Sequence, residues 1–83
     1  MVINCNIERG NPPFKFEWTK DGRLITSDDH TKIKVDEEDS TLSIKSTRES
    51  DVGNYTCTAK NAFGSDSFTT RLIIQGRLIF EVK

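Results

Sequence analysis

The sequence predicts an all-β fold in which two antiparallel sheets pack face to face. Apolar and polar residues alternate with a period of two along several short segments. Turn residues separate these segments at intervals of about 8–12 residues, and no segment shows the period of about 3.6 residues that marks an amphipathic helix. The chain has 83 residues, which is enough for one small domain.

Three strands are predicted in the first part of the chain. The inward residues of the two longer ones are Ile3, Cys5 and Ile7, and then Phe14, Phe16 and Trp18. Residues 10–13 separate these two strands, because Gly, Asn and Pro favour turns. Asp21-Gly22 is a strong hairpin signal, and the apolar pair Leu24-Ile25 that follows it predicts a third, short strand.

Four further strands are predicted after the polar loop of residues 26–31. Their inward residues are Ile33 and Val35, then Leu42 and Ile44, then Tyr55, Cys57 and Ala59, and finally Phe68, Thr70, Leu72 and Ile74. Turns separate these strands at residues 36–39, 46–50 and 61–64. The outward side of each strand is polar, so we expect both sheets to face solvent.

The composition limits the partners and the source of stability. Thirteen acidic and twelve basic residues give a net charge of −1, and phosphate binding requires an excess of Lys and Arg, so we expect no nucleic-acid partner. Hydrophobic residues make up 34% of the chain, which is low for a packed core and favours a covalent cross-link. No apolar run approaches the ~20 residues of a membrane span. We therefore expect the chain to be a module that meets a membrane only through a longer parent chain.

The order and spacing of a few residues make the prediction more specific. Cys5 is followed by Trp18, then by Leu42-Ser43-Ile44, and then by the run Asp51-Val52-Gly53-Asn54-Tyr55-Thr56-Cys57. The turn segment Ala59-Lys60-Asn61-Ala62-Phe63-Gly64 comes next. Over residues 2–75 this pattern resembles the I-set of the immunoglobulin superfamily.

The resemblance implies an immunoglobulin-like β-sandwich with antiparallel Greek-key connections. It also implies a buried disulfide between Cys5 and Cys57 that joins the two sheets, with Trp18 and Leu42 in the core around it. Tyr55 is then a tyrosine corner, whose hydroxyl bonds to nearby backbone. The cysteine count alone leaves open the alternative of two buried free thiols.

A narrower resemblance rests on residues 10–23, Gly10-Asn11-Pro12-Pro13-Phe14-Lys15-Phe16-Glu17-Trp18-Thr19-Lys20-Asp21-Gly22-Arg23. This segment is similar to immunoglobulin domains of the Dscam (Down syndrome cell adhesion molecule) family, especially the arthropod forms. The resemblance implies a homophilic cell-adhesion ectodomain, one of many alternatively spliced isoforms.

The two ends of the chain depart from the I-set pattern. Only four residues precede Cys5, so we expect residues 1–76 to form the domain without its usual N-terminal strand A. Residues 77–83 alternate like an additional strand. This tail would either turn back at Gln75-Gly76 as an antiparallel hairpin or fill the strand A position of another molecule. We prefer the exchanged strand, because an unfilled edge on both sheets favours aggregation.

Two surface features are candidate functional sites. Asn54-Tyr55-Thr56 is an N-glycosylation sequon whose asparagine points outward. The outer face of one sheet carries Lys residues near acidic residues, which suits an antiparallel contact between two copies of the chain. The residues of this candidate self-binding face are Asn4, Asn6, Lys32, Lys34, Ser43 and Lys45.

No catalytic or metal site is predicted. His30 is the single histidine, and we expect it to be a solvated loop residue rather than a base or ligand. The acidic residues at 28–29 and 36–39 lack the spacing of a calcium loop. Asp51 is expected to order the turn before Tyr55, with Arg48 or Lys32 as an exposed charge partner. We therefore expect no enzymatic activity, no metal and no cofactor.

These observations favour an extracellular adhesion or recognition module, part of the ectodomain of a cell-surface protein, that binds protein and self-associates. The alternative is a structural I-set spacer of an intracellular giant muscle protein. The sequon and the cysteine pair favour the extracellular module.

Overall fold

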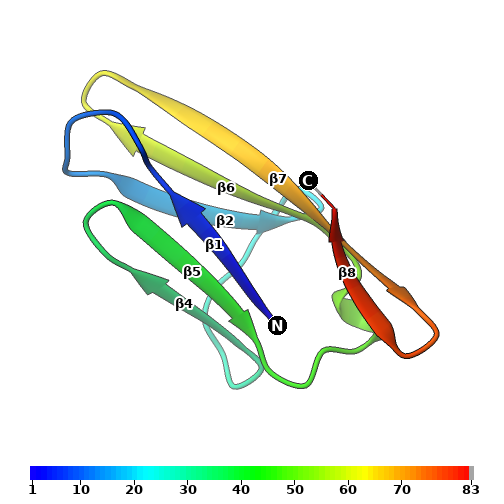
Figure 1. Ribbon diagram of the computed structural model, residues 1–83. Helices are drawn as coiled ribbons and strands as arrows, with labels where there is room; N and C mark the ends of the chain where they lie inside the picture. The colour runs from blue at the N-terminus through cyan, green and yellow to red at the C-terminus, as the bar shows by residue number, and fades with distance from the viewer. Residues whose placement is uncertain (83) are drawn as a thin grey trace.

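The computed structural model describes residues 1–82, which form a sandwich of two antiparallel sheets (Figure 1). The smaller sheet has the order β1 (Val2–Asn6), β5 (Asp39–Ile44), β4 (Thr31–Val35). The larger sheet has the order β3 (Arg23–Leu24), β2 (Lys15–Lys20), β6 (Gly53–Asn61), β7 (Gly64–Gln75), β8 (Leu78–Val82). A turn of 3₁₀ helix, η1 (Glu49–Asp51), precedes β6. The predicted all-β, two-sheet architecture is confirmed.

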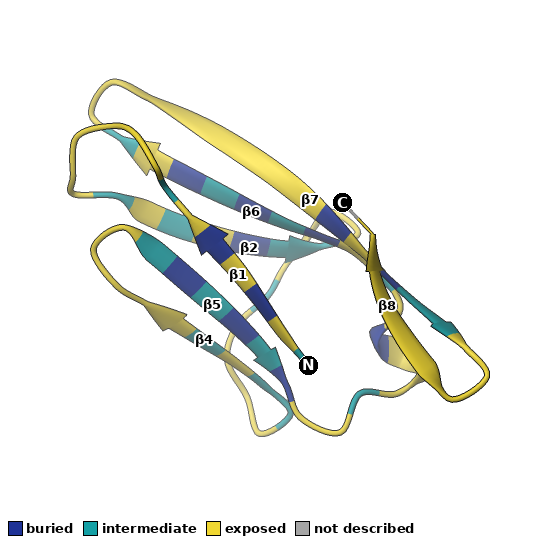
Figure 2. Cartoon of the chain, viewed as in Figure 1, coloured by how far each residue is buried: buried dark blue, intermediate teal, exposed yellow. Residues whose placement is uncertain are grey.

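The alternation read from the sequence places the core between the two sheets (Figure 2). The registers put Ile3 beside Leu42 in the smaller sheet and Trp18 beside Cys57 in the larger one. The buried apolar residues are Ile3, Cys5, Trp18, Leu42, Ile44, Tyr55, Cys57, Ala59 and Leu72. Each large side chain that is fully buried contributes about 1.5–3 kcal/mol, so this small set accounts for much of the hydrophobic stabilisation.

The Asp21-Gly22 hairpin forms as predicted, although the strand after it is shorter than expected. Asp21 and Gly22 both have positive φ, 49° and 84°, as a type I′ turn requires. The Asp21 carboxylate also accepts a hydrogen bond from the Asn54 backbone N–H at 3.0 Å. The strand β3 ends at Leu24 rather than at Ile25, whose N–H still donates to the Trp18 carbonyl at 2.9 Å.

The tail folds back on its own chain. Among the described residues β1 lies at an edge of the smaller sheet, with no strand A beside it, and β8 pairs antiparallel with β7 from Gln75–Leu78 to Arg71–Val82. Gly76 has a φ of 61° and so allows the two-residue turn that joins the strands. The single chain therefore adopts the hairpin, which is the alternative that the sequence analysis placed below the exchanged strand. Lys83, the last residue of the predicted tail, lies outside the described residues.

Candidate protein-binding surface

The two sheets are joined at the centre of the core by a disulfide between Cys5 on β1 and Cys57 on β6. The Cα atoms of the two cysteines are 6.4 Å apart, and both residues are buried. Trp18 is the register neighbour of Cys57 and is also buried. The disulfide and the position of Trp18 thus agree with what the family resemblance implied.

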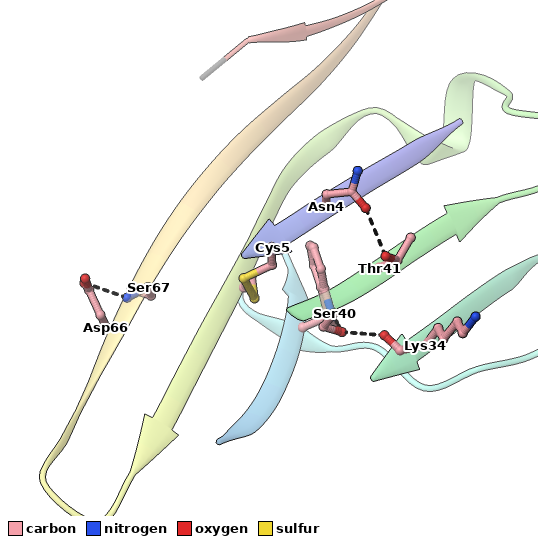
Figure 3. Close-up of a disulfide and its surroundings, with 9 residues drawn as sticks. Asn4, Cys5, Lys34, Ser40, Thr41, Asp66 and Ser67 are labelled. Atoms are coloured by element: carbon pink, nitrogen blue, oxygen red, sulfur yellow. Dashed lines mark hydrogen bonds between the residues drawn. A yellow bond between two sulfur atoms is a disulfide. The ribbon is translucent and has the colours of Figure 1, made fainter. Parts of the chain in front are cut away.

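A short chain of hydrogen bonds runs from this core to the strand that carries the candidate binding face (Figure 3). Trp18 Nε1 donates to Ser40 Oγ at 2.9 Å, and Ser40 Oγ donates to the Lys34 carbonyl at 2.9 Å. Ser40 is buried, so these bonds satisfy its hydroxyl, which would otherwise be costly to bury. The backbone of β4 is fixed in this way directly beneath the exposed Lys34 side chain.

The turn before β6 is organised around Asp51, as expected, but through a different partner. Tyr55 Oη donates to the Asp51 carbonyl at 2.5 Å, which is the tyrosine corner. The Asp51 carboxylate accepts from the Arg48 backbone N–H at 2.9 Å and lies 2.9 and 3.0 Å from His30 Nε2. The expectation that the Arg48 or Lys32 side chain pairs with the Asp51 carboxylate is therefore wrong. His30 takes that place, and Arg48 contributes only its backbone N–H.

His30 is correspondingly not the solvated loop residue that the sequence suggested. Its side chain is 22% exposed and that of Asp51 is 10% exposed. Asp28 brings His30 into place, because its carboxylate accepts hydrogen bonds from the backbone N–H groups of His30 and Thr31 at 2.8 and 2.7 Å. His30 and Asp51 are 21 residues apart in the chain, and no local sequence pattern links them.

These contacts change the acidity of three groups. Burial favours the neutral form of Asp51, but hydrogen bonds from Arg48 and His30 outweigh it and lower the pKa of Asp51. The pKa of Asp28 is lowered by its backbone hydrogen bonds from Thr31 and His30. Burial, together with the negative charges of Asp51 and Asp21, raises the pKa of Tyr55 to about 12. The group therefore holds the Tyr55 hydroxyl neutral beside an ionised Asp51.

The outer face of the smaller sheet brings together five of the six residues of the predicted self-binding face: Asn4, Asn6, Lys32, Lys34 and Ser43. Ser43 is half-buried and the other four are exposed. Asn4 and Lys34 lie on either side of Thr41 on the central strand, and Thr41 Oγ1 donates to Asn4 Oδ1 at 2.9 Å (Figure 3). The result is a polar row across three strands.

Two further residues, Lys45 and Thr41, bear on this face. Lys45 is exposed but lies one position beyond the end of β5, where its N–H donates to the His30 carbonyl at 2.8 Å. Thr41 belongs to the face and was missed, although the alternation along β5, with Ser40 and Leu42 buried, would have placed it outward.

The sequon lies on the other side of the molecule. Asn54 is an exposed residue of β6 in the larger sheet, opposite Arg71 of β7. Thr56, the third residue of the sequon, shares a side-chain hydrogen bond of 2.8 Å with Thr69. The larger sheet also carries Lys15 and Lys60, exposed register neighbours on its outer face.

Two general features complete the description of the surface. No group of three or more His, Cys, Asp or Glu residues within residues 1–82 is placed to hold a metal ion. None of the helical structure in the described part of the chain is long and apolar enough to cross a membrane.

Comparison with known proteins places this arrangement in a family. A family model described as the immunoglobulin I-set domain matches residues 1–74. Contactin of Drosophila melanogaster is 38% identical over 79 residues, which cover 95% of this chain and 5% of contactin. The mouse cell adhesion molecule DSCAML1 is 36% identical over 75 residues, 90% of this chain and 4% of that protein. The chain thus spans a very small part of these relatives.

Solved structures of single domains agree with this assignment. The Dscam1 Ig7 domain, isoform 5, superposes with a TM-score of 0.79 and 26% identity, covering 84% of this chain and 73% of that domain. The titin domain M7 superposes with a TM-score of 0.76 and 38% identity, covering 90% of this chain and 78% of that domain. Together with the family model, these likenesses show that the chain belongs to the I-set family of immunoglobulin domains.

Proposed function

We propose that this domain is an extracellular recognition module that binds protein, including a second copy of itself, through the outer face of its smaller sheet. The observation that carries the proposal is the polar row of exposed Asn4, half-buried Thr41 and exposed Lys34, with Lys32 beside it, on a sheet face that nothing in residues 1–82 covers. A rigid polar face of this kind provides hydrogen bonds and charges in fixed positions, which favours specific recognition.

The charges on this face suit contact between two copies. Lys32 and Lys34 are exposed on β4, and the acidic turn of residues 36–39 follows directly at the end of that strand. Each copy therefore carries positive charge along the strand and negative charge at one end. An antiparallel, two-fold contact would place the lysines of each copy against the acidic turn of the other.

Two features support an extracellular setting. The Cys5–Cys57 disulfide is a bond that persists mainly in oxidising compartments. The sequon asparagine, Asn54, is exposed on the larger sheet, so a glycan there would leave the smaller sheet accessible. Relatives that include a protein named as a cell adhesion molecule agree with this setting.

Sedimentation velocity tests the self-binding face. The change is the charge reversal K32E/K34E, and the matched control is K15E/K60E, which reverses two exposed lysines on the opposite sheet. We expect the parent domain to associate as its concentration rises, the K32E/K34E variant to associate about tenfold more weakly, and the control to match the parent. Equal association of all three proteins would contradict the proposed face.

A second candidate function is a structural spacer in an intracellular muscle protein. The observation that favours it is the 38% identity to titin domain M7 over 90% of the chain. Alkylation of the native protein under non-reducing conditions separates the two functions. An oxidised Cys5–Cys57 pair supports the extracellular module, and two alkylated thiols support the spacer.

A further inference from the structure

The strand β8 is an exposed, apolar edge of the larger sheet (Figure 2). Leu78, Ile79, Phe80 and Val82 are 63%, 45%, 40% and 49% exposed, and Glu81 is the one charged residue among the five of the strand. Within the described residues β7 is its only neighbour. A sheet edge with unpaired backbone groups and exposed apolar side chains is a template for pairing with another strand.

The hairpin register fixes which backbone groups of β8 are available. Gln75 and Leu78 close the two-residue turn, and in such a turn the closing residues form a hydrogen-bonded pair. The bonding then alternates along an antiparallel ladder. Leu78, Phe80 and Val82 therefore direct their backbone N–H and C=O groups toward β7, while those of Ile79 and Glu81 point to the open edge.

We propose that the β8 strands of two copies pair antiparallel across a two-fold axis at Ile79. In this register Ile79 lies opposite Ile79 of the second copy. Arg77, the residue just before β8, lies opposite Glu81 of the second copy, and the symmetry forms this charge pair twice. On the other face of the strand, Leu78 lies opposite Phe80 of the second copy. The five-stranded sheets of the two copies would then continue into each other.

Charge complementarity selects both this register and a second copy as the occupant. Among the described residues neither Arg77 nor Glu81 forms an ion pair within its own chain, and both are exposed. A register centred on Phe80 would place the apolar Ile79 opposite Glu81 and leave Arg77 unmatched by any described residue. Only the register centred on Ile79 matches opposite charges and apolar residues together, and opposite charges across strands are stabilising.

This edge is distinct from the binding face under Proposed function, which lies on the smaller sheet. The two contacts are therefore separable by mutation. Association that is measured in the K32E/K34E variant comes mainly from the edge. Failure of one proposal therefore leaves the other testable.

The experiment is sedimentation velocity on charge-reversed variants of the β8 edge, each made in the K32E/K34E protein. Arg77→Glu places Glu opposite Glu, and Glu81→Arg places Arg opposite Arg, so each variant alone should associate about tenfold or more weakly than its parent. An equimolar mixture of the two should form a heterodimer, because each copy then meets opposite charges. The double swap R77E/E81R should restore self-association.

Unchanged melting temperatures will show that the variants fold, as expected for substitutions at exposed positions. A parent protein that stays monomeric, single variants that associate as tightly as the parent, or a mixture that stays monomeric would each overturn the proposal.

Discussion

Replacement of Asp51 by alanine tests the contacts that hold the turn before β6. The carboxylate accepts a hydrogen bond from the Arg48 N–H at 2.9 Å and lies 2.9 and 3.0 Å from His30 Nε2, and its side chain is 10% exposed. A hydrogen bond to a charged group contributes about 1.5–3 kcal/mol. Loss of both partners should therefore lower the free energy of unfolding by about 3 kcal/mol at pH 7.

The assay is urea unfolding followed by the fluorescence of Trp18, the single tryptophan of the chain. Glu49→Ala is the matched control, because Glu49 is an exposed acidic residue of the same 3₁₀ turn. The control should change the free energy of unfolding by about 0.5 kcal/mol or less.

The pH dependence gives a second test. The folded-state pKa of Asp51 is below its ordinary value of 3.8, so the stabilisation by the carboxylate is present above that value and is lost as pH falls through the folded pKa. The difference between the parent and Asp51→Ala should be present at pH 5 and shrink in stronger acid. A loss no larger than that of the Glu49 control, or a difference that persists in strong acid, would refute the reasoning.

Three further changes test the core. Replacing Cys5 and Cys57 by alanine removes a cross-link between residues 52 positions apart and should lower the free energy of unfolding by about 4 kcal/mol in the chain-entropy model; unchanged urea unfolding would contradict this. Thr70→Val should raise the free energy of unfolding by about 1 kcal/mol, because Thr70 Oγ1 is buried without a hydrogen-bond partner among the described residues; a less stable variant would show that the hydroxyl has a partner. The pKa of Tyr55 is raised from 10.0 to about 12, so its stabilising contribution is full below pH 10 and lost by about pH 12. Between pH 10 and pH 12 the free energy of unfolding should therefore fall less for Tyr55→Phe than for the parent. Equal falls would contradict the raised pKa of Tyr55.

The fold was predictable because its determinants repeat locally along the chain. The inward positions of Ile3, Trp18 and Leu42 follow from alternation, and all three are buried. The outward positions of Asn4 and Lys34 follow from the same alternation, so most of the candidate binding face was predictable as well. The outward position of Thr41 could have been predicted from the same alternation. That Lys45 lies one position beyond the end of β5 could not be read from the alternation.

The remaining features depend on contacts that the local pattern does not encode. His30 meets Asp51 because the Asp28 turn and η1 come together in space, and neither segment alone indicates the other. The alternation of residues 77–83 fits a hairpin and an exchanged strand equally well. Gly76 made the local turn possible, and a contact within one chain requires no second molecule.

Aggregation of beads coated with the domain tests the central claim, self-recognition through the smaller sheet, most directly. Beads that carry the parent domain or the K15E/K60E control should cluster with one another, and beads that carry K32E/K34E should cluster several-fold more slowly. Clustering of the K32E/K34E beads at the rate of the parent, or dispersed beads for all three proteins, would contradict the proposed function.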